Sequence, residues 1–222
     1  MSFEELMSTR WSCREFLPET LDEETLTRLF TAAQRTASWC NTQSWGVHLL
    51  SGDAAEWLGK ELLARVSSGS PGAADFPVPT TYSGVYADRR RAAGHGLYEM
   101  LGIERSDSMG RLEQMLRNFT FFGAPHVAIV TADAEHGTYG AIDCGGYVAN
   151  LMNAAHDLGL GSIAQGAIAM HSDAVRELLD LPEDRLVVCA VSFGRPASGH
   201  PVNSFRTERA SLDEVVTRVE RP

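Results

Sequence analysis

The sequence lacks any long hydrophobic run, and no apolar stretch approaches the roughly 20 residues that a membrane-spanning helix needs. It also has no internal repeat and no low-complexity segment. Its first residues, MSFEELMSTRW, are acidic and amphipathic, whereas a secretory signal starts basic and apolar. With 44% apolar and 22% charged residues, the 222-residue chain has the composition of an ordinary globular protein, and we expect no membrane partner.

Cysteine is scarce and scattered. The four residues, Cys13, Cys40, Cys144 and Cys189, form no CxxC pair, and no HExxH motif occurs. Neither a zinc site nor a disulfide framework is therefore indicated, and we expect no metal. These features predict a cytoplasmic, reduced protein with free thiols.

Positive charge is also in short supply, since the formal net charge is −10. An acidic surface repels phosphate backbones and anionic lipids, which argues against nucleic-acid binding. The few basic clusters become more informative against this background. They lie at Arg10 and Arg14, at 88–91 (DRRR), and at Arg206 and Arg209.

Motifs for self-contained catalysis are missing as well. There is no GxSxG nucleophile motif, no GxGxxG dinucleotide fingerprint and no GxxxxGK[ST] phosphate loop. The seven histidines show no ligand spacing. An enzyme without an evident acid, base, metal or nucleophile usually relies on an organic cofactor. We therefore assign no catalytic side chain.

Hydrophobic periodicity predicts an α+β protein with a central, mostly antiparallel or mixed sheet flanked by helices. Helices are expected at 3–10, 17–37, 54–69, 140–161 and 172–181, with two more over 85–117 broken at Gly102. Strands are expected at 46–52, 126–133 and 184–194. An extended loop rich in proline and glycine is expected at 70–84.

Helix ends and faces can also be predicted. Thr20 or Asp22 is expected to cap one helix, and Ser172 or Asp173 another. The long helix over 140–161 should end at Gly159 or Gly161. Its apolar face is expected to consist of Ile142, Val148, Leu151, Met152, Ala155 and Leu158.

Two basic segments could bind a phosphate group. In an extended chain Arg10, Ser12 and Arg14 point the same way, and arginine binds phosphate oxygens in pairs. Arg206 and Arg209 form a second pair near the other end. Solvated, ion-paired arginines are the alternative for each segment, and nothing in the sequence shows that the two ends meet.

The segment ASWCNTQSW is too polar for a buried strand and too aromatic for an ordinary loop. Its two indoles and two carboxamides suit a flat molecule with hydrogen-bonding edges. GLGSIAQG at 159–166, which includes Gln165, leaves backbone N–H groups free for a ligand, although most such loops are only connectors. Asn118 precedes a strand together with three phenylalanines, which are more often core residues.

Taken in order along the chain, these motifs resemble the FMN-dependent nitroreductase family, from about Arg10 to Val216. The matching stretches are RWSCREF, AAQRTASWCNTQSW, GLGSIAQG, LVVCAVSFGRP and RTERASLDEVV. The combination of SWCNTQ, FFGAPHVAIV and NSFRTER is most similar to the branch with nitrobenzoate and other nitroaromatic reductases.

The resemblance implies which residues bind FMN. The ribityl phosphate is expected to lie among residues from both chain ends, namely Arg10, Trp11, Ser12, Arg14, Arg206 and Arg209. The flavin ring is expected to lie against Ser38, Trp39, Asn41 and Gln43 of a partner subunit. Asn118 is expected at the pyrimidine edge. The backbone of Ser162, Ile163, Ala164, Gln165 and Gly166 is expected along the ring near N5.

The resemblance also implies a homodimer with FMN at a helical interface, NAD(P)H as reductant, and small nitroaromatic or quinone substrates reduced in a ping-pong exchange. The whole chain, 1–222, is expected to form a single domain with a lid at about 73–117. Two alternatives remain on the same scaffold. One is a flavoenzyme that catalyses a different reaction, such as a dehydrogenase or dehalogenase, and the other is a non-catalytic flavin-binding protein.

The sequence departs from the family pattern at three positions. Ala37 and Ser44 stand where the family usually has proline, which leaves that loop less restricted in φ. Gln165 stands where many members have a glutamate near flavin N5, which removes a negative charge. The preference for NADH or NADPH is therefore not predicted.

Overall fold

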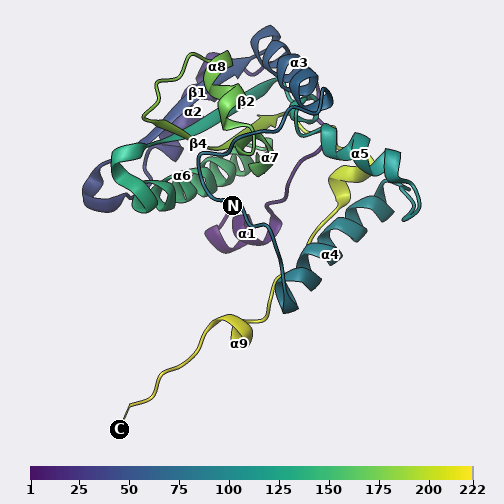
Figure 1. Cartoon of the computed structure of the whole chain (residues 1–222). Helices are drawn as coiled ribbons and strands as arrows, with labels where there is room; N and C mark the ends of the chain where they lie inside the picture. The colour runs from purple at the N-terminus through teal and green to yellow at the C-terminus, as the bar shows by residue number, and fades with distance from the viewer. Residues whose placement is uncertain (222) are drawn as a thin grey trace.

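The computed structural model describes residues 1–221 and has an antiparallel sheet at its centre (Figure 1). Within those residues the sheet has four strands in the order β1-β2-β4-β3, and each neighbouring pair is antiparallel. The strands are β1 (Trp45–Ser51), β2 (His126–Asp133), β3 (Gly161–Gln165) and β4 (Arg185–Gly194). The α+β prediction is confirmed, and so are the three strands that were expected.

Strand β3 was not predicted, because its five residues, GSIAQ, looked like a connector. Its carbonyl and amide groups instead pair with β4, in a register that sets Ser162 opposite Phe193 and Gln165 opposite Ala190. Three of its residues are small and carry little β-propensity, so pairing with the long β4 decides its conformation. The β3 N–H groups that point toward β4 are therefore not available to a ligand.

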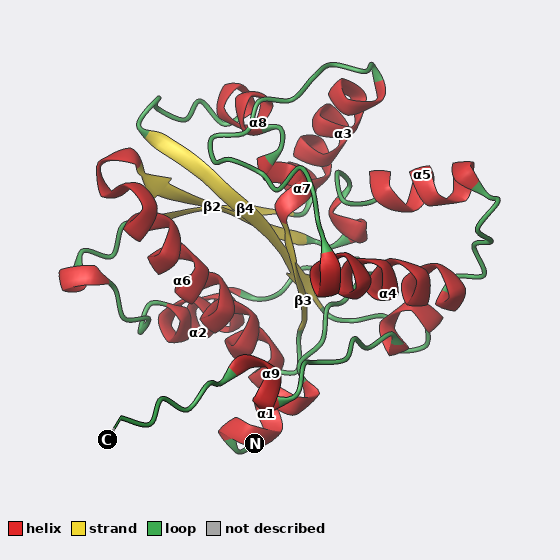
Figure 2. Ribbon diagram, turned by 60° about the horizontal axis from the view of Figure 1, so that its bottom comes forward, coloured by secondary structure: helices red, strands yellow, loops and turns green. Residues whose placement is uncertain are grey.

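Helices cover both faces of the sheet, which explains why β2 is buried along nearly its whole length (Figure 2). Successive side chains of a strand point to opposite faces, so Val127 and Ile129 enter one hydrophobic cluster while Ala128 and Val130 enter the other. A strand that is covered on both faces usually has a nearly continuous apolar sequence, and HVAIV in β2 follows this pattern.

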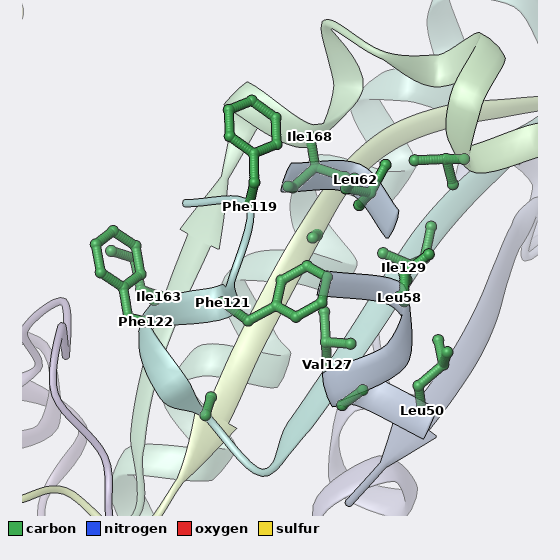
Figure 3. Close-up of a cluster of buried hydrophobic side chains, with 14 of the residues drawn as sticks. Leu50, Leu58, Leu62, Phe119, Phe121, Phe122, Val127, Ile129, Ile163 and Ile168 are labelled. Carbon is green, nitrogen blue, oxygen red and sulfur yellow. The ribbon is translucent and has the colours of Figure 1, made fainter. Parts of the chain in front are cut away.

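On one face lie α3 (Asp53–Ser67), α7 (Gly166–Ala169) and α8 (Ser172–Leu178). Figure 3 shows the cluster that they build with the sheet, in which Leu58 and Leu62 of α3 pack near Phe121 and Ile129. The predicted cap of α8 was wrong: Ser172 is its first helical residue, and its Oγ donates to the Ala169 carbonyl.

On the other face lie α2 (Glu23–Ala33) and the long α6 (Gly137–Asp157). Asp22 caps α2 by accepting a hydrogen bond from the Thr25 N–H, as predicted, and α6 ends just before Gly159, which has a φ of +73°. The predicted apolar face was partly wrong. Ile142 is 60% exposed, and the buried positions are Gly140, Cys144, Tyr147, Val148, Leu151 and Ala155.

Outside these layers lie α4 (Gly84–Met100) and α5 (Ser108–Leu116), and Gly102 lies in the turn after α4, as predicted (Figure 1). No residue of α4 is buried. The start of the expected lid is nevertheless attached to the body, because Asp75 accepts hydrogen bonds from Arg176 at 2.8 Å and from the Val187 N–H at 2.7 Å.

The remaining elements are short. They are α1 (Phe3–Thr9), α9 (Leu212–Val215) and the 3₁₀ turns η1 (Trp39–Asn41), η2 (Phe121–Gly123), η3 (Ala134–His136) and η4 (Pro201–Ser204). The chain after α9 extends away from the body (Figure 1). Within residues 1–221, none of the helices is both long and apolar enough to cross a bilayer.

Candidate functional site

The N-terminal basic segment is extended and lies along β3. Ser12 forms a parallel bridge to Ser162, and the Cys13 N–H donates to the Ser162 carbonyl at 3.0 Å. Cys13 is fully buried and packs directly over Gly161, where a Cβ would lie 2.7 Å from the Cys13 sulfur. A glycine is therefore needed here for close approach. With Cys13 facing inward, its neighbours Ser12 and Arg14 face outward.

The C-terminal basic segment meets the N-terminal one after η4. Phe205 and the residues up to Arg209 lie beside Arg10 and Arg14, around a hollow of about 240 Å³. We call this the arginine hollow. It is lined by Met7, Ser8, Arg10, Trp11, Ser12, Arg14, Phe205, Arg206, Thr207 and Arg209. The structure thus brings together all six residues predicted at the phosphate.

The electrostatics of the arginine hollow are those of an anion site. Burial and then the charge of Arg209 lower the pKa of Arg10, and burial lowers the pKa of Arg14 and of Arg206. Within residues 1–221, no carboxylate lies within 4.0 Å of these four side chains. Gathering like charges without counter-ions is unfavourable unless an anion joins them.

One guanidinium nitrogen in the hollow has no hydrogen-bond partner among the described residues. Nη1 of Arg10 is buried and has no hydrogen-bond partner in the part of the chain that the structure describes. Buried polar groups are nearly always paired, so an unpaired guanidinium N–H in a lined hollow indicates a ligand acceptor. Arg206 stacks on the Trp11 ring, with its Cζ 4.6 Å from the ring centroid. This stacking orients the N–H donors of the Arg206 guanidinium group.

The segment 38–43 is not part of the arginine hollow in one protomer. The Trp39 N–H donates to the Asp143 carboxylate at 3.0 Å, near the start of α6, whereas Thr9 hydrogen-bonds His156 at the end of α6. At 1.5 Å rise per residue, these two α6 positions are about 20 Å apart. The residues predicted to line one flavin thus occupy opposite ends of α6.

The local structure of this loop is strained and tightly held. Cys40, Asn41 and Gln43 all have positive φ, between 47° and 59°. The Gln43 N–H donates to Ser38 Oγ at 2.9 Å, and the Gln43 carboxamide donates to the Asn41 carbonyl at 3.0 Å. These hydrogen bonds fix the loop in place of the two prolines that it lacks. Strained loops fixed in this way are common at functional sites.

The Trp39 side chain is presented outward from this loop. Its indole is 57% exposed and lies 4.5 Å from the Tyr139 ring, centroid to centroid. The indole therefore offers a flat apolar surface.

The structure links Asn118 and Gln165, which the sequence did not predict. The Gln165 side chain is buried: its Nε2 donates to the Asn118 carbonyl at 2.7 Å, and its Oε1 accepts from Ser192. The glutamine therefore holds the backbone of Asn118. The Asn118 carboxamide donates to the Met115 carbonyl at 2.9 Å and remains partly exposed.

Several residues of the site were missed in the sequence. Phe205, Thr207, Met7 and Ser8 line the arginine hollow, and the buried Asn203 lies behind it. No motif chemistry distinguishes these residues, and only their place within NSFRTER, between the paired arginines, could have drawn attention to them.

Thiol and metal chemistry receive no support from the geometry. Burial raises the pKa of the Cys13 and Cys144 thiols to about 11 and of Cys189 to about 12, so these thiols stay protonated and unreactive. Cys40 is exposed, and all four cysteines are free. No group of three or more potential metal ligands occurs within residues 1–221.

Comparison with known proteins agrees with this geometry. A 4-nitrobenzoate reductase from Nocardioides sp. (strain LMS-CY) is 30% identical over 220 residues, 97% of this chain and 89% of that protein. The nitroreductase NfnB of Mycolicibacterium smegmatis is 34% identical over 219 residues, 98% of this chain and 92% of the relative.

Solved structures are equally similar. The FMN-dependent nitroreductase NfnB from Mycobacterium smegmatis, in complex with NADPH, superposes with a TM-score of 0.91 at 33% identity over 98% of this chain and 97% of that one. An FMN- and NADPH-dependent NfnB from Sphigopyxis sp. strain HMH gives 0.94 at 29% identity over 100% of both chains. The model of the nitroreductase family matches residues 7–195. The chain therefore belongs to the nitroreductase family.

Proposed function

We propose that the protein is an FMN-dependent oxidoreductase that passes hydride from NAD(P)H to nitroaromatic or quinone-type substrates. One observation carries this proposal: two basic segments from opposite chain ends converge on the arginine hollow, and no acidic residue is among those that line it. The relatives named as nitroreductases, two of them FMN-dependent with NADPH as reductant or ligand, support the same activity.

The residues of the arginine hollow fit a phosphate dianion. The unpaired Nη1 of Arg10 supplies a donor, and Arg14, Arg206 and Arg209 supply further charge. Arginine offers its N–H groups in a fork that matches phosphate oxygens, so each side chain can bind in a bidentate way. Ser12 adds a hydroxyl donor from the same extended segment.

Bound FMN supplies two-electron hydride chemistry between NAD(P)H and a nitroaromatic or quinone, in a ping-pong exchange. The chain's own residues bind and orient. The Asn118 carboxamide already donates to Met115, so its Oδ1 is left to accept from a pyrimidine N–H. Ala164 and Gly166 are exposed beside it, which lets a flat ring approach the backbone of β3. The buried Gln165 keeps Asn118 in position.

We include a homodimer in the proposal, because one protomer lacks a complete site. A twofold axis perpendicular to α6, passing near Ala149 and Asn150, would exchange the two helix ends and set the 38–43 loop of a second copy beside the arginine hollow. The exposed face of α6 near this axis carries mostly small side chains, which suits helix packing. Its outward-facing residues include Ile142, Gly145, Gly146 and Ala149. Small residues let helices approach closely.

The C-terminal tail supports the same assembly. After α9, whose Glu214 pairs with Arg89 of α4 at 3.0 Å, the chain leaves the body of its own protomer (Figure 1). In this region Leu212, Val215, Val216 and Val219 are between 52% and 76% exposed. Apolar side chains on a projecting segment are expected to pack on another surface.

The proposal treats residues 1–222 as a single FMN-binding domain in which the segment over about 73–117 serves as a lid. The hydrogen bonds from Arg176 and Val187 to Asp75 support a hinge that lies after that residue. A cytoplasmic setting is part of the same proposal, since all four cysteines are free.

The test is anaerobic addition of NADH, and separately of NADPH, to the yellow protein purified with its flavin. Rapid bleaching by either nucleotide, followed by recovery of colour with a nitroaromatic or quinone, is the expected result. Bound flavin that neither nucleotide reduces would instead favour a dehydrogenase, a dehalogenase or a non-catalytic flavin protein. Failure to bind FMN at all would refute the cofactor.

A further inference from the structure

Asn203 of η4 is a buried carboxamide that lies directly behind the arginine hollow without lining it. Its Oδ1 accepts from the Arg14 N–H at 2.9 Å and from the Cys13 thiol at 3.5 Å. Its Nδ2 donates to the Glu15 carbonyl at 2.7 Å and to the Ala197 carbonyl at 3.0 Å. The carboxamide therefore has partners on both sides.

These bonds join the two chain ends. Among the described residues 1–221, every hydrogen bond between the segments 10–15 and 203–209 is made by the Asn203 side chain. The same residue reaches the C-terminal arginines through its backbone, because the Asn203 carbonyl accepts from Arg206 Nη1 at 2.8 Å. Asn203 thus contacts the backbone N–H of Arg14 through its side chain and the guanidinium of Arg206 through its backbone carbonyl.

The other contacts between these segments are less directional. Arg14 lies 5.9 Å from the Phe205 ring centroid, and Arg206 lies 4.6 Å from that of Trp11. Such contacts tolerate sliding of a guanidinium over a ring, whereas hydrogen bonds fix distance and direction. The spacing between the two arginines therefore depends on the carboxamide.

We propose that Asn203 is a positioning residue for the phosphate site, which fixes Arg14 and Arg206 at the spacing that a phosphate group requires. This inference rests on the proposed function. It assigns to Asn203 no contact with the phosphate itself, since its side chain is fully engaged behind the hollow.

The test compares FMN with riboflavin, which has the same ring but no phosphate. Dissociation constants for both are measured by flavin fluorescence in the wild type, in Asn203→Ala and in Val130→Ala. Val130 is a fully buried residue of β2 in the other part of the core, so its truncation controls for lost stability. Loss of the hydrogen bonds is expected to weaken FMN binding roughly tenfold or more. Riboflavin binding should change by less than about threefold, which corresponds to one weak contact.

A purely structural role predicts something else, namely an equal loss for both flavins in Asn203→Ala, as in Val130→Ala, and that result would overturn the inference. An unchanged FMN constant would overturn it too. If Asn203→Ala does not fold, Asn203→Ser serves the same comparison, because its hydroxyl can replace one of the bonds and should give an intermediate loss confined to FMN.

The outcomes for the wild type separate this inference from the proposed function. Equal affinity for FMN and riboflavin would refute the phosphate site and the inference with it. Binding of neither flavin would refute the cofactor alone. Calorimetric titration with inorganic phosphate then decides: binding by the wild type that Asn203→Ala loses supports the positioning role, and any other pattern overturns it.

Discussion

At the scale of single residues, the site depends on four guanidinium groups that an acidic chain holds together without counter-ions. The pKa of Arg10 is lowered by burial and by Arg209, so the positive charges that line the hollow disfavour one another. A bound dianion relieves that repulsion. Affinity for the cofactor should therefore come largely from its phosphate.

Removal of two of these charges tests the assignment. Arg14→Ala combined with Arg209→Ala takes one arginine from each chain end, and we expect the protein to be purified colourless. The measurement is the ratio of flavin absorbance near the visible maximum to protein absorbance.

A matched control changes the charge equally elsewhere. Arg28→Ala with Arg65→Ala also takes the formal net charge from −10 to −12 (−10 − 2), but both residues lie on α2 and α3 outside the hollow. This control should stay yellow. Stoichiometric FMN in the first variant would contradict the phosphate assignment.

His126 provides a residue-scale prediction on stability. Its ring is fully buried, Nε2 accepts from the Leu21 N–H at 2.8 Å, and Nδ1 hydrogen-bonds Ser51 Oγ at 2.7 Å. Burial lowers the pKa of His126, so the folded state keeps it neutral while the unfolded state takes up a proton near pH 6.5. Its contribution is present above about pH 6.5 and is lost as the pH falls below that value.

Urea unfolding at pH 7.5, 6.5 and 5.5 measures this effect. The free energy of unfolding should fall by at most about 1.4 kcal/mol per pH unit from this one group. Partial burial also lowers the pKa of His48 and His156, which add to the total, so the comparison is with His126→Gln, in which the slope below pH 6.5 should be shallower. Identical slopes would contradict the assignment.

At the scale of elements, strong periodicity was enough to predict most helices and three strands. The predictions were wrong where the local sequence pattern and the tertiary context favour different structures. Strand β3 has too little β-propensity to be recognised, and it exists because β4 offers a partner edge. Ile142 fits the apolar spacing of α6, yet it faces outward, since the helix carries apolar residues on more than one face.

The site was predictable to a similar extent. The alternation of Arg10, Ser12 and Arg14 correctly predicted that they face the same way, because period two follows from an extended backbone. Convergence with Arg206 and Arg209 is a long-range contact that local pattern does not encode, and only the family resemblance implied it. Asn203 has no motif of its own, so its linking role became visible only in three dimensions.

Replacing either of two glycines of the α4 region by alanine should change stability, but in opposite directions. Gly94 lies inside α4 with open space around its Cα, so Gly94→Ala should raise the free energy of unfolding by about 0.5–1 kcal/mol. Gly102 has equal space but a φ of +68°, which L-residues rarely adopt. Gly102→Ala should therefore lower stability by about 1 kcal/mol.

Chemical denaturation of the two variants in parallel is the measurement. Because neither Cβ would meet a neighbour within 4 Å, packing does not complicate the comparison. A change of the same sign in both would show that backbone conformation at Gly102 does not decide where α4 ends.

At the scale of the whole molecule, the proposed site requires two copies, because α6 separates its two halves. Ala149→Arg places a charge in the middle of the exposed stripe of α6, and we expect it to reduce both dimer mass and bound flavin together. Light scattering and flavin absorbance on the same samples check this.

Ala64→Arg is the matched control, since Ala64 is an exposed alanine of α3 on the opposite face of the sheet. It should remain dimeric and yellow. An Ala149→Arg protein with a monomer mass near 24.2 kDa that keeps its flavin would contradict the shared site.

The arginine hollow has a consequence for biosynthesis, because its walls come from the first and the last parts of the chain. During translation Arg10 leaves the ribosome early, whereas Arg209 is still within the exit tunnel when residue 209 is added. A nascent polypeptide therefore cannot bind a phosphate with all four side chains until the segment that carries Arg206 and Arg209 has left the tunnel. Full retention of the cofactor has to wait for that segment, however early the N-terminal arginines emerge.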